Sequence, residues 1–352
     1  MKVTIEQMKA VILAHAVGDA LAVPAEGKTK EALKKHPITE MYKGGRHHMP
    51  TGAWSDDTSM SLCALKPLAQ GNIDFDAIMQ NFYKWYYEDK FTPAKETFGE
   101  ERTCALAIRN YFDLRLPYAQ CGLKDADSNG NGSLMRIYPF ALYAATRDDL
   151  EDALALQKGA ETLCAPLKLV HAGSALTHAH PCSRMACTVY AYVLWALLKK
   201  ADKAVVAPAV RAAYEINSAL GSIEGAQLGD LSYIKADSEI RSLLDPLLDG
   251  TLLEAEIKNT PYVLHTLQIA LWALLSTDSF EACVVKAISL GGNTTANAAV
   301  AGSLAGALYG LDAIPERWLT KLIKASAMER LAETAHSNWS ADSSHGLDFK
   351  WE

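Results

Sequence analysis

The chain has 352 residues, of which 49% are hydrophobic and 21% charged, so it can bury a sizeable core. Its 34 Lys and Arg against 41 Asp and Glu give a formal net charge of −7, which argues against nonspecific binding to nucleic acid or to an anionic membrane. Seven cysteines with no Cys-x-x-Cys pair indicate neither a disulfide framework nor a zinc site, so buried free thiols are the better interpretation.

The N-terminal apolar stretch is too short and too interrupted for an export signal, so we expect a cytoplasmic protein with no membrane association. Beyond it, apolar residues recur at helical spacing and no comparable run alternates with period two. The pattern predicts helices over residues 6–23, 58–68, 75–87, 104–114, 185–199, 263–275 and 281–289. The fold class is therefore expected to be all-α.

Residues 297–310 form a further predicted helix, rich in small side chains. Gly302, Gly306 and Gly310 recur at four-residue spacing, which places them on one face and lets another helix approach closely. The stretch is too short to be a membrane dimerisation motif, so close packing inside a core is preferred.

The chain has no low-complexity linker and no repeat at a solenoid period. We therefore expect one domain over residues 1–352. Residues 202–259 are the least informative part, and a peripheral helical insertion is the expectation for them.

Five polar clusters interrupt the apolar helices, and burying such groups is costly unless they bind something. The first runs from Asp19 to Glu26, where capping of a helix end accounts for Asp19 alone. The second is Ser55, Asp56 and Asp57, directly before a helix. Capping explains one of these carboxylates but not two, and hard oxygen ligands suit Mg²⁺. From this segment alone, capping and metal binding remain equally open.

The other three clusters are weaker when each is taken alone. Residues 129–136 are a Gly/Asn turn, read either as an ordinary turn or as a cradle for a sugar phosphate. His178 and His180 are two residues apart, a spacing more often structural than metal-binding. The turn at Gly291 and Gly292 precedes a helix whose neutral first residues could cap it or face a ligand.

Taken together and in this order, the five clusters resemble the ADP-ribosylglycohydrolase family, from about Gln7 to about Trp318. The resemblance implies a compact orthogonal bundle of helices with a metal-containing cleft. It also implies hydrolysis of the N- or O-glycosidic bond of ADP-ribose, with one or two Mg²⁺ ions, or Mn²⁺, as cofactor. The implied partner is ADP-ribose, or a protein or small molecule that carries it.

The resemblance also assigns roles to residues. Glu26 matches a catalytic or water-orienting carboxylate, and Asp57 is the second candidate for proton transfer. The expected metal ligands are Ser55, Asp56, Asp57, Asn293 and Thr295. The expected substrate-binding residues are Asn131, Gly132, Ser133, His178, Gly291 and Gly292.

Two departures from the family pattern matter. After the Gly-Gly turn the family usually continues with Asp-x-Asp-Thr, whereas this chain has Asn293, Thr294, Thr295 and Ala296. The loss of two carboxylates should severely weaken the binding of at least one ion. Where many bacterial relatives have Phe-Asp-Ile-Gly-Asn, residues 98–102 read Phe-Gly-Glu-Glu-Arg, in which Glu100 or Glu101 could partly replace the lost contact.

Two functions follow from these observations. The first is a metal-assisted glycosidic-bond hydrolase with an altered second ligand motif. The alternative is a catalytically impaired protein that binds ADP-ribose as a sensor or regulator on the same scaffold. A helical protein with no site would leave the paired carboxylates of Asp56 and Asp57 unexplained. The leaving group, the number of ions and the oligomeric state are left open by the sequence.

Overall fold

The computed structural model describes residues 2–146, 165–220 and 231–341, and within these ranges the regular structure is helical, with three isolated β-bridges and no strand. The predicted all-α class is confirmed. The helices are α1 (Ile5–Ala22), α2 (Lys30–Lys35), α3 (Asp56–Ala69), α4 (Phe75–Glu88), α5 (Arg102–Phe112), α6 (Tyr138–Ala145), α8 (Ala165–Ala175), α9 (Pro181–Lys199), α10 (Val206–Leu220), α12 (Ser232–Leu248), α13 (Val263–Leu275), α14 (Phe280–Ser289), α15 (Thr294–Tyr309), α16 (Glu316–Leu319) and α17 (Ala325–Ala341).

Every predicted helical range coincides with an observed helix, with ends that differ by a few residues. Local capping explains part of this agreement. Thr4 begins α1 with a capping box, in which its hydroxyl accepts from the Gln7 N–H at 3.2 Å and the Gln7 side chain accepts from the Thr4 N–H at 3.0 Å. The analysis did not single out α6, whose residues are all buried, because a helix that is apolar on every side has no periodic pattern.

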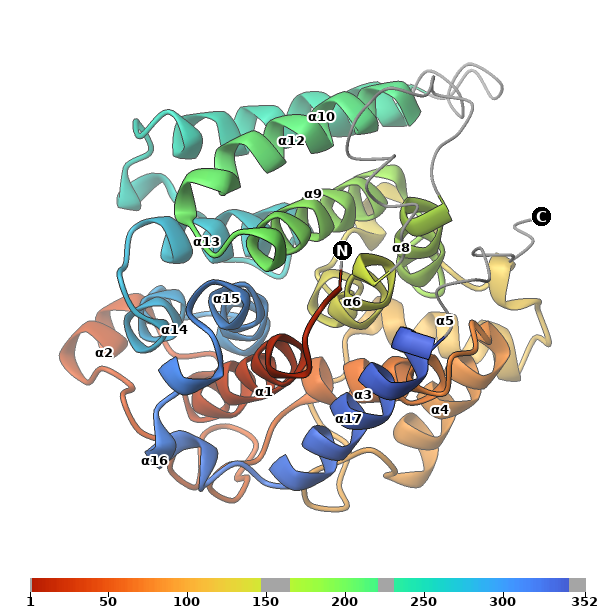
Figure 1. Ribbon diagram of the computed structural model, residues 1–352, viewed down its shortest axis with the longest axis horizontal. Helices are drawn as coiled ribbons and strands as arrows, with labels where there is room; N and C mark the ends of the chain where they lie inside the picture. The colour runs from red at the N-terminus through yellow and green to blue at the C-terminus, as the bar shows by residue number, and fades with distance from the viewer. Residues whose placement is uncertain (1, 147–164, 221–230, 342–352) are drawn as a thin grey trace.

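Helices α1 and α15 pack most closely and form the centre of the bundle (Figure 1). Gly18, Gly302 and Gly306 make this approach possible, because a Cβ added at these positions would lie 2.2, 2.5 and 2.6 Å from a carbonyl oxygen of the facing helix. The predicted close packing is therefore confirmed for Gly302 and Gly306. It is wrong for Gly310, which has no such neighbour and instead ends α15 with φ of 82°, a conformation that favours glycine.

The buried core is continuous from Val3 to Trp339 within the described residues. It includes the free thiols of six cysteines, as predicted, while Cys164 lies outside the described residues. By length and composition the segment Ile5–Ala25 could cross a membrane, yet 94% of its apolar window is buried inside the protein, where it serves as a core helix.

Helices α10 and α12 come from the part of the chain for which an insertion was expected. They pack on α9, at the edge of the bundle that is uppermost in Figure 1. The single-domain assignment itself stays a prediction. On the other side of the core, the start of α3, the start of α15 and the segment after α1 meet at one cavity, which positions the candidate site.

Candidate functional site

A cavity of about 190 Å³ contains most of the polar residues that the sequence singled out. Seven of the predicted site residues line it, namely Glu26, Ser55, Asp56, Asp57, Asn131, Asn293 and Thr295. The remaining lining residues are His47, Gly99, Glu101, Met135, Pro261 and Ala296. Segments separated by more than 250 residues in sequence thus form one small, strongly polar pocket.

A second cavity, of about 560 Å³, lies on the surface between α4 and the end of α5. Its lining includes Tyr83, Tyr111 and Phe112. It is larger and more open than the polar cavity, but none of the predicted site residues lies in it. Size alone therefore does not locate the chemistry of this protein.

The segment before α3 combines a helix cap with two carboxylates that the cap does not need. Ser55 is the N-cap, and its hydroxyl accepts from the Asp57 N–H at 3.3 Å and donates to Asp57 Oδ2 at 2.8 Å. Asp57 Oδ1 is buried and has no hydrogen-bond partner. Asp56 is also buried and lines the cavity. Capping is thus performed by Ser55, which leaves the two carboxylates available for a ligand.

Asp19 holds this segment in place from the neighbouring helix. The expectation that it caps its own helix is wrong, because α1 continues to Ala22. Its carboxylate instead accepts from the N–H groups of Ser55, at 3.0 Å, and Thr58, at 3.0 Å, and from the Thr58 hydroxyl at 2.7 Å. Asp19 therefore satisfies free N–H groups at the start of α3, a contact that only the tertiary structure creates.

Glu26 connects the first cluster to the last. Its Oε1 accepts from the Asn293 side chain at 3.2 Å. Its Oε2 accepts from the Thr294 hydroxyl at 3.1 Å and from both the N–H and the hydroxyl of Thr295 at 3.3 Å. The neutral residues that replace the usual acidic pair thus surround a carboxylate with donors, so Glu26 becomes the anionic group at the start of α15.

The electrostatics of the pocket favour a bound cation. Burial, followed by the charges of Asp57, Asp19 and Glu26, raises the pKa of Asp56 well above its usual range. Burial and the charge of Asp19 raise the pKa of Asp57 in the same way. Burial raises the pKa of Asp19 to about 6, although Thr58 and Ser55 donate to it. These buried carboxylates destabilise one another when they are ionised, and a divalent cation would remove that cost.

The Gly/Asn loop reaches the cavity through Asn131 alone among the three residues predicted from it. The Asn131 N–H donates to the Pro261 carbonyl at 2.8 Å, so it is not free to bind an anion. Its side chain donates to the Thr266 hydroxyl at 2.8 Å and to Asn293 Oδ1. Ser133 is fully buried and its hydroxyl accepts from Ser174 at 3.0 Å. Direct contact of Ser133 with a ligand in the cavity is therefore not what this geometry supports.

The glycine turn supports the cavity without lining it. Gly291 and Gly292 have φ values of 74° and 62°, which favour glycine. The Gly292 N–H donates to the Lys28 carbonyl and its own carbonyl accepts from the Gly27 N–H, both at 2.9 Å. This pairing brings the segment after α1 beside the start of α15, and so places Glu26 next to Asn293.

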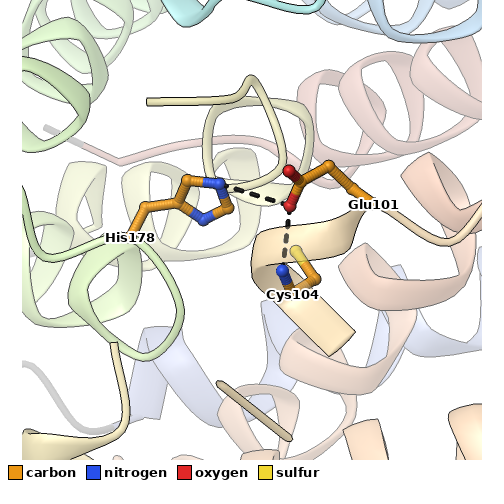
Figure 2. A group of neighbouring side chains, drawn as sticks. All are labelled: Glu101, Cys104 and His178. Atoms are coloured by element: carbon orange, nitrogen blue, oxygen red, sulfur yellow. Dashed lines mark hydrogen bonds and ion pairs between the residues drawn. The ribbon is translucent and has the colours of Figure 1, made fainter. Parts of the chain in front are cut away.

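Glu101 enters the cavity, as one of the two expectations for the altered 98–102 segment allowed, whereas Glu100 is exposed. Its Oε2 lies 3.4 Å from Nε2 of His178, a residue that is fully buried behind the cavity (Figure 2). Burial raises the pKa of Glu101, but His178 and the N–H groups of Cys104 and Thr103 outweigh it and lower the pKa to about 2. Glu101 is therefore ionised, and His178 acts on the pocket through it.

Two further positions clarify the outcome for the histidines and the altered segment. His180 is the N-cap of α9 and its Nδ1 accepts from the Cys182 N–H at 3.1 Å, which is the structural role expected for it. Gly99 packs so tightly that an added Cβ would lie 2.5 Å from Asp56 Oδ1. No local sequence signal marks His47 or Pro261, which reach the cavity from loops.

Comparison with known proteins decides the family. The sequence profile of the ADP-ribosylglycohydrolase family matches residues 2–344. This chain belongs to the ADP-ribosylglycohydrolase family. This ADP-ribosylglycohydrolase homologue is also similar to a solved structure, titled an ADP-ribosylglycohydrolase-related protein complex, with a TM-score of 0.73 and 29% identity, covering 96% of this chain and 100% of the other. The resemblance inferred from five motifs is confirmed.

Curated relatives of this family member carry hydrolase names. ADP-ribosylarginine hydrolase Tri1 of Serratia proteamaculans is 26% identical over 336 residues, which is 94% of this chain and 79% of the relative. ADP-ribosyl-[dinitrogen reductase] glycohydrolase of Rhodospirillum rubrum is 29% identical over 316 residues, or 88% of each chain. The family and these relatives support glycohydrolase chemistry on ADP-ribosylated substrates as the general activity.

Proposed function

We propose that this protein hydrolyses the glycosidic bond of an ADP-ribosylated substrate with the help of a divalent cation, and that ADP-ribosyl-arginine is the first substrate to test. The observation that carries the proposal is the pair of buried carboxylates, Asp56 and Asp57, in the same cavity as Glu26. The names of the relatives support the arginine adduct.

The residues present fit a hard cation. Asp57 Oδ1 is buried without a hydrogen-bond partner, although an ionised carboxylate oxygen in that position requires one. Carboxylate and hydroxyl oxygens are ligands that Mg²⁺ and Mn²⁺ accept. Ser55, Asp56 and Asp57 would hold such an ion, with neutral oxygens available from Asn293 and Thr295. When bound, the ion supplies electrophilic assistance and orients the ribose hydroxyls and a water molecule.

Glu26 is the residue of this chain best placed to handle a proton. Its Oε2 accepts three hydrogen bonds, whereas Oε1 accepts one, so Oε1 is the oxygen with more capacity to accept a further bond from a water molecule. A positive charge develops at the anomeric carbon in the transition state, and the carboxylates of Glu26, Asp56 and Glu101 around the cavity stabilise it.

The test is release of free ADP-ribose from an ADP-ribosyl-arginine peptide, with Mg²⁺, with Mn²⁺ and with EDTA. Release that requires the cation is the expected result. The neutral residues at Asn293 and Thr295 favour the second candidate, an ADP-ribose-binding protein. Tight binding of ADP-ribose, measured by calorimetry, together with no release at high enzyme concentration would overturn hydrolysis in favour of that candidate.

The stabilisation of the folded chain by Mg²⁺ is expected to increase as the pH rises. Because burial raises the pKa values of Asp19, Asp56 and Asp57, these groups favour the metal-free folded state at low pH, and that stability is lost as the pH rises through their folded pKa, about 6 for Asp19. A cation binds the ionised carboxylates and offsets this loss.

The measurement is the melting temperature in Mg²⁺ minus that in EDTA, taken in steps from about pH 5.5 to about pH 8. Groups that titrate equally in both series, such as the buried histidines, cancel in the difference. A difference that stays flat or shrinks with rising pH would place the cation away from these carboxylates.

A further inference from the structure

Glu101, Cys104 and His178 form a cluster behind the polar cavity that the proposed hydrolysis does not use as a unit (Figure 2). One ligand atom from each residue lies within 4.8 Å of the other two. The side chain of His178 is fully buried, and its Nε2 faces Glu101 Oε2 at 3.4 Å without a hydrogen-bond partner. A thiol, an imidazole and a carboxylate are together the donor set of zinc-class ions rather than of Mg²⁺.

We propose that Glu101, Cys104 and His178 bind a zinc-class divalent metal ion, at a site separate from the hard-cation cluster of Asp56 and Asp57. In tetrahedral zinc sites the ligand atoms are separated by about 3.2 to 3.8 Å, so the observed 3.4 Å between Nε2 and Oε2 already suits a shared ion. Three protein ligands leave a fourth position open, as in zinc sites that accept water or a ligand.

The sequence excluded zinc because it has no Cys-x-x-Cys pair, and the structure shows why that test misses this cluster. Glu101 caps α5 and Cys104 lies three residues later in its first turn, where the Cys104 N–H donates to Glu101 Oε2 at 2.9 Å. This spacing puts the two side chains on neighbouring positions of one helix turn. His178 arrives from 74 residues further along the chain, between α8 and α9.

The surroundings support the ligand forms of these side chains. The Thr177 hydroxyl lies 2.8 Å from His178 Nδ1 and accepts from Arg136 at 2.7 Å. With an ion on Nε2, the imidazole proton resides on Nδ1 and is donated to Thr177, which is the outer contact that orients metal-binding histidines. Burial raises the pKa of the Cys104 thiol well above its usual range, while Arg136 and Thr177 oppose that rise.

Binding would therefore proceed with a defined proton balance. The ion displaces the Cys104 thiol proton to solvent, and the proton of His178 moves from Nε2 to Nδ1. The thiolate and the Glu101 carboxylate then neutralise the two charges of the ion. The backbone of Gly132 leaves room for this, because a Cβ there would lie 2.8 Å from Cys104 Sγ and 2.9 Å from Glu101 Oε2.

The test is a titration of the full chain with Co²⁺ in excess Mg²⁺, so that the hard-cation cluster is already satisfied. We expect one Co²⁺ per chain, visible bands of tetrahedral intensity and a thiolate-to-cobalt absorption in the near ultraviolet, all removed by Zn²⁺. Cys104→Ser should lose the thiolate absorption, and Cys121→Ser, a change at another buried thiol outside the cluster, should keep it.

Glu101→Gln gives a second reading that leaves the thiol in place. It should weaken Co²⁺ binding by at least about tenfold, since loss of even an outer contact of a metal ligand costs that much. Asp57→Asn should keep the full spectrum, which separates this site from the proposed catalytic ion. The proposal is overturned if folded wild-type protein shows no thiolate absorption, or if the absorption persists in Cys104→Ser. Loss of hydrolysis in any variant bears only on the proposed function.

Discussion

Asp57→Asn is expected to reduce cation-dependent release of ADP-ribose by at least about 100-fold while leaving the metal-free protein as stable as the wild type or more so. The substituted side chain can keep its oxygen toward the Ser55 hydroxyl, which now donates to Asp57 Oδ2 at 2.8 Å. Its NH₂ group then occupies the place of Oδ1, the buried oxygen without a partner, and repels a cation there. Removal of the charge also ends the repulsion that raises the pKa of Asp57.

The pairing of these two effects separates function from structure. A residue needed only for folding would lower the melting temperature when replaced, whereas Asp57→Asn should lower only the Mg²⁺-induced rise in melting temperature and the rate. Asp113→Asn makes the same chemical change at an exposed position and serves as the matched control. An Mg²⁺-induced rise equal to that of the wild type would show that the ion binds elsewhere.

The double variant Asn293→Asp with Thr295→Asp should tighten Mg²⁺ binding by at least about tenfold, or about 1.4 kcal/mol. The new carboxylates would stand where Asn293 and Thr295 now donate to Glu26, at 3.2 and 3.3 Å. Without metal they replace two attractive contacts by repulsion from Glu26, so the metal-free melting temperature should fall. With Mg²⁺ the same charges become ligands, and the difference between the two conditions should exceed that of the wild type.

Calorimetric titration with Mg²⁺ measures the affinity, and melting temperatures in EDTA and Mg²⁺ measure the two opposite effects. Ser326→Asp with Ser337→Asp adds the same two charges at exposed positions of α17 and should change neither. If the affinity of the double variant stays at the wild-type value although it folds, the start of α15 does not contribute to an ion site in this chain.

The same comparison interprets the altered ligand motif. In this chain Glu26 receives four hydrogen bonds from residues 293–295, so the neutral side chains are satisfied without any metal. We infer that substitution at Asn293 and Thr295 moved the negative charge of this corner onto Glu26 alone. One ion at Asp56 and Asp57, rather than two, is the number that this arrangement supports.

The sequence by itself determined the helical class and the family, because both depend on local order along the chain. Apolar residues at helical spacing record which face of each helix is buried, and α13 was predicted with the bounds that it has. Paired Asp56 and Asp57 after Ser55 stood out because a helix start needs only one capping group. These features can be read from neighbouring residues alone.

The tertiary structure alone decided how the site is built, since its contacts join residues that are far apart in sequence. Asp19 was read as a local cap, but its carboxylate reaches the start of α3. Glu101 gained its place in the cavity from His178, a residue on another segment. Hydrogen bonds and charges act over a few ångströms in space, so a periodic pattern cannot report them until packing, such as that of α1 against α15, brings the segments together.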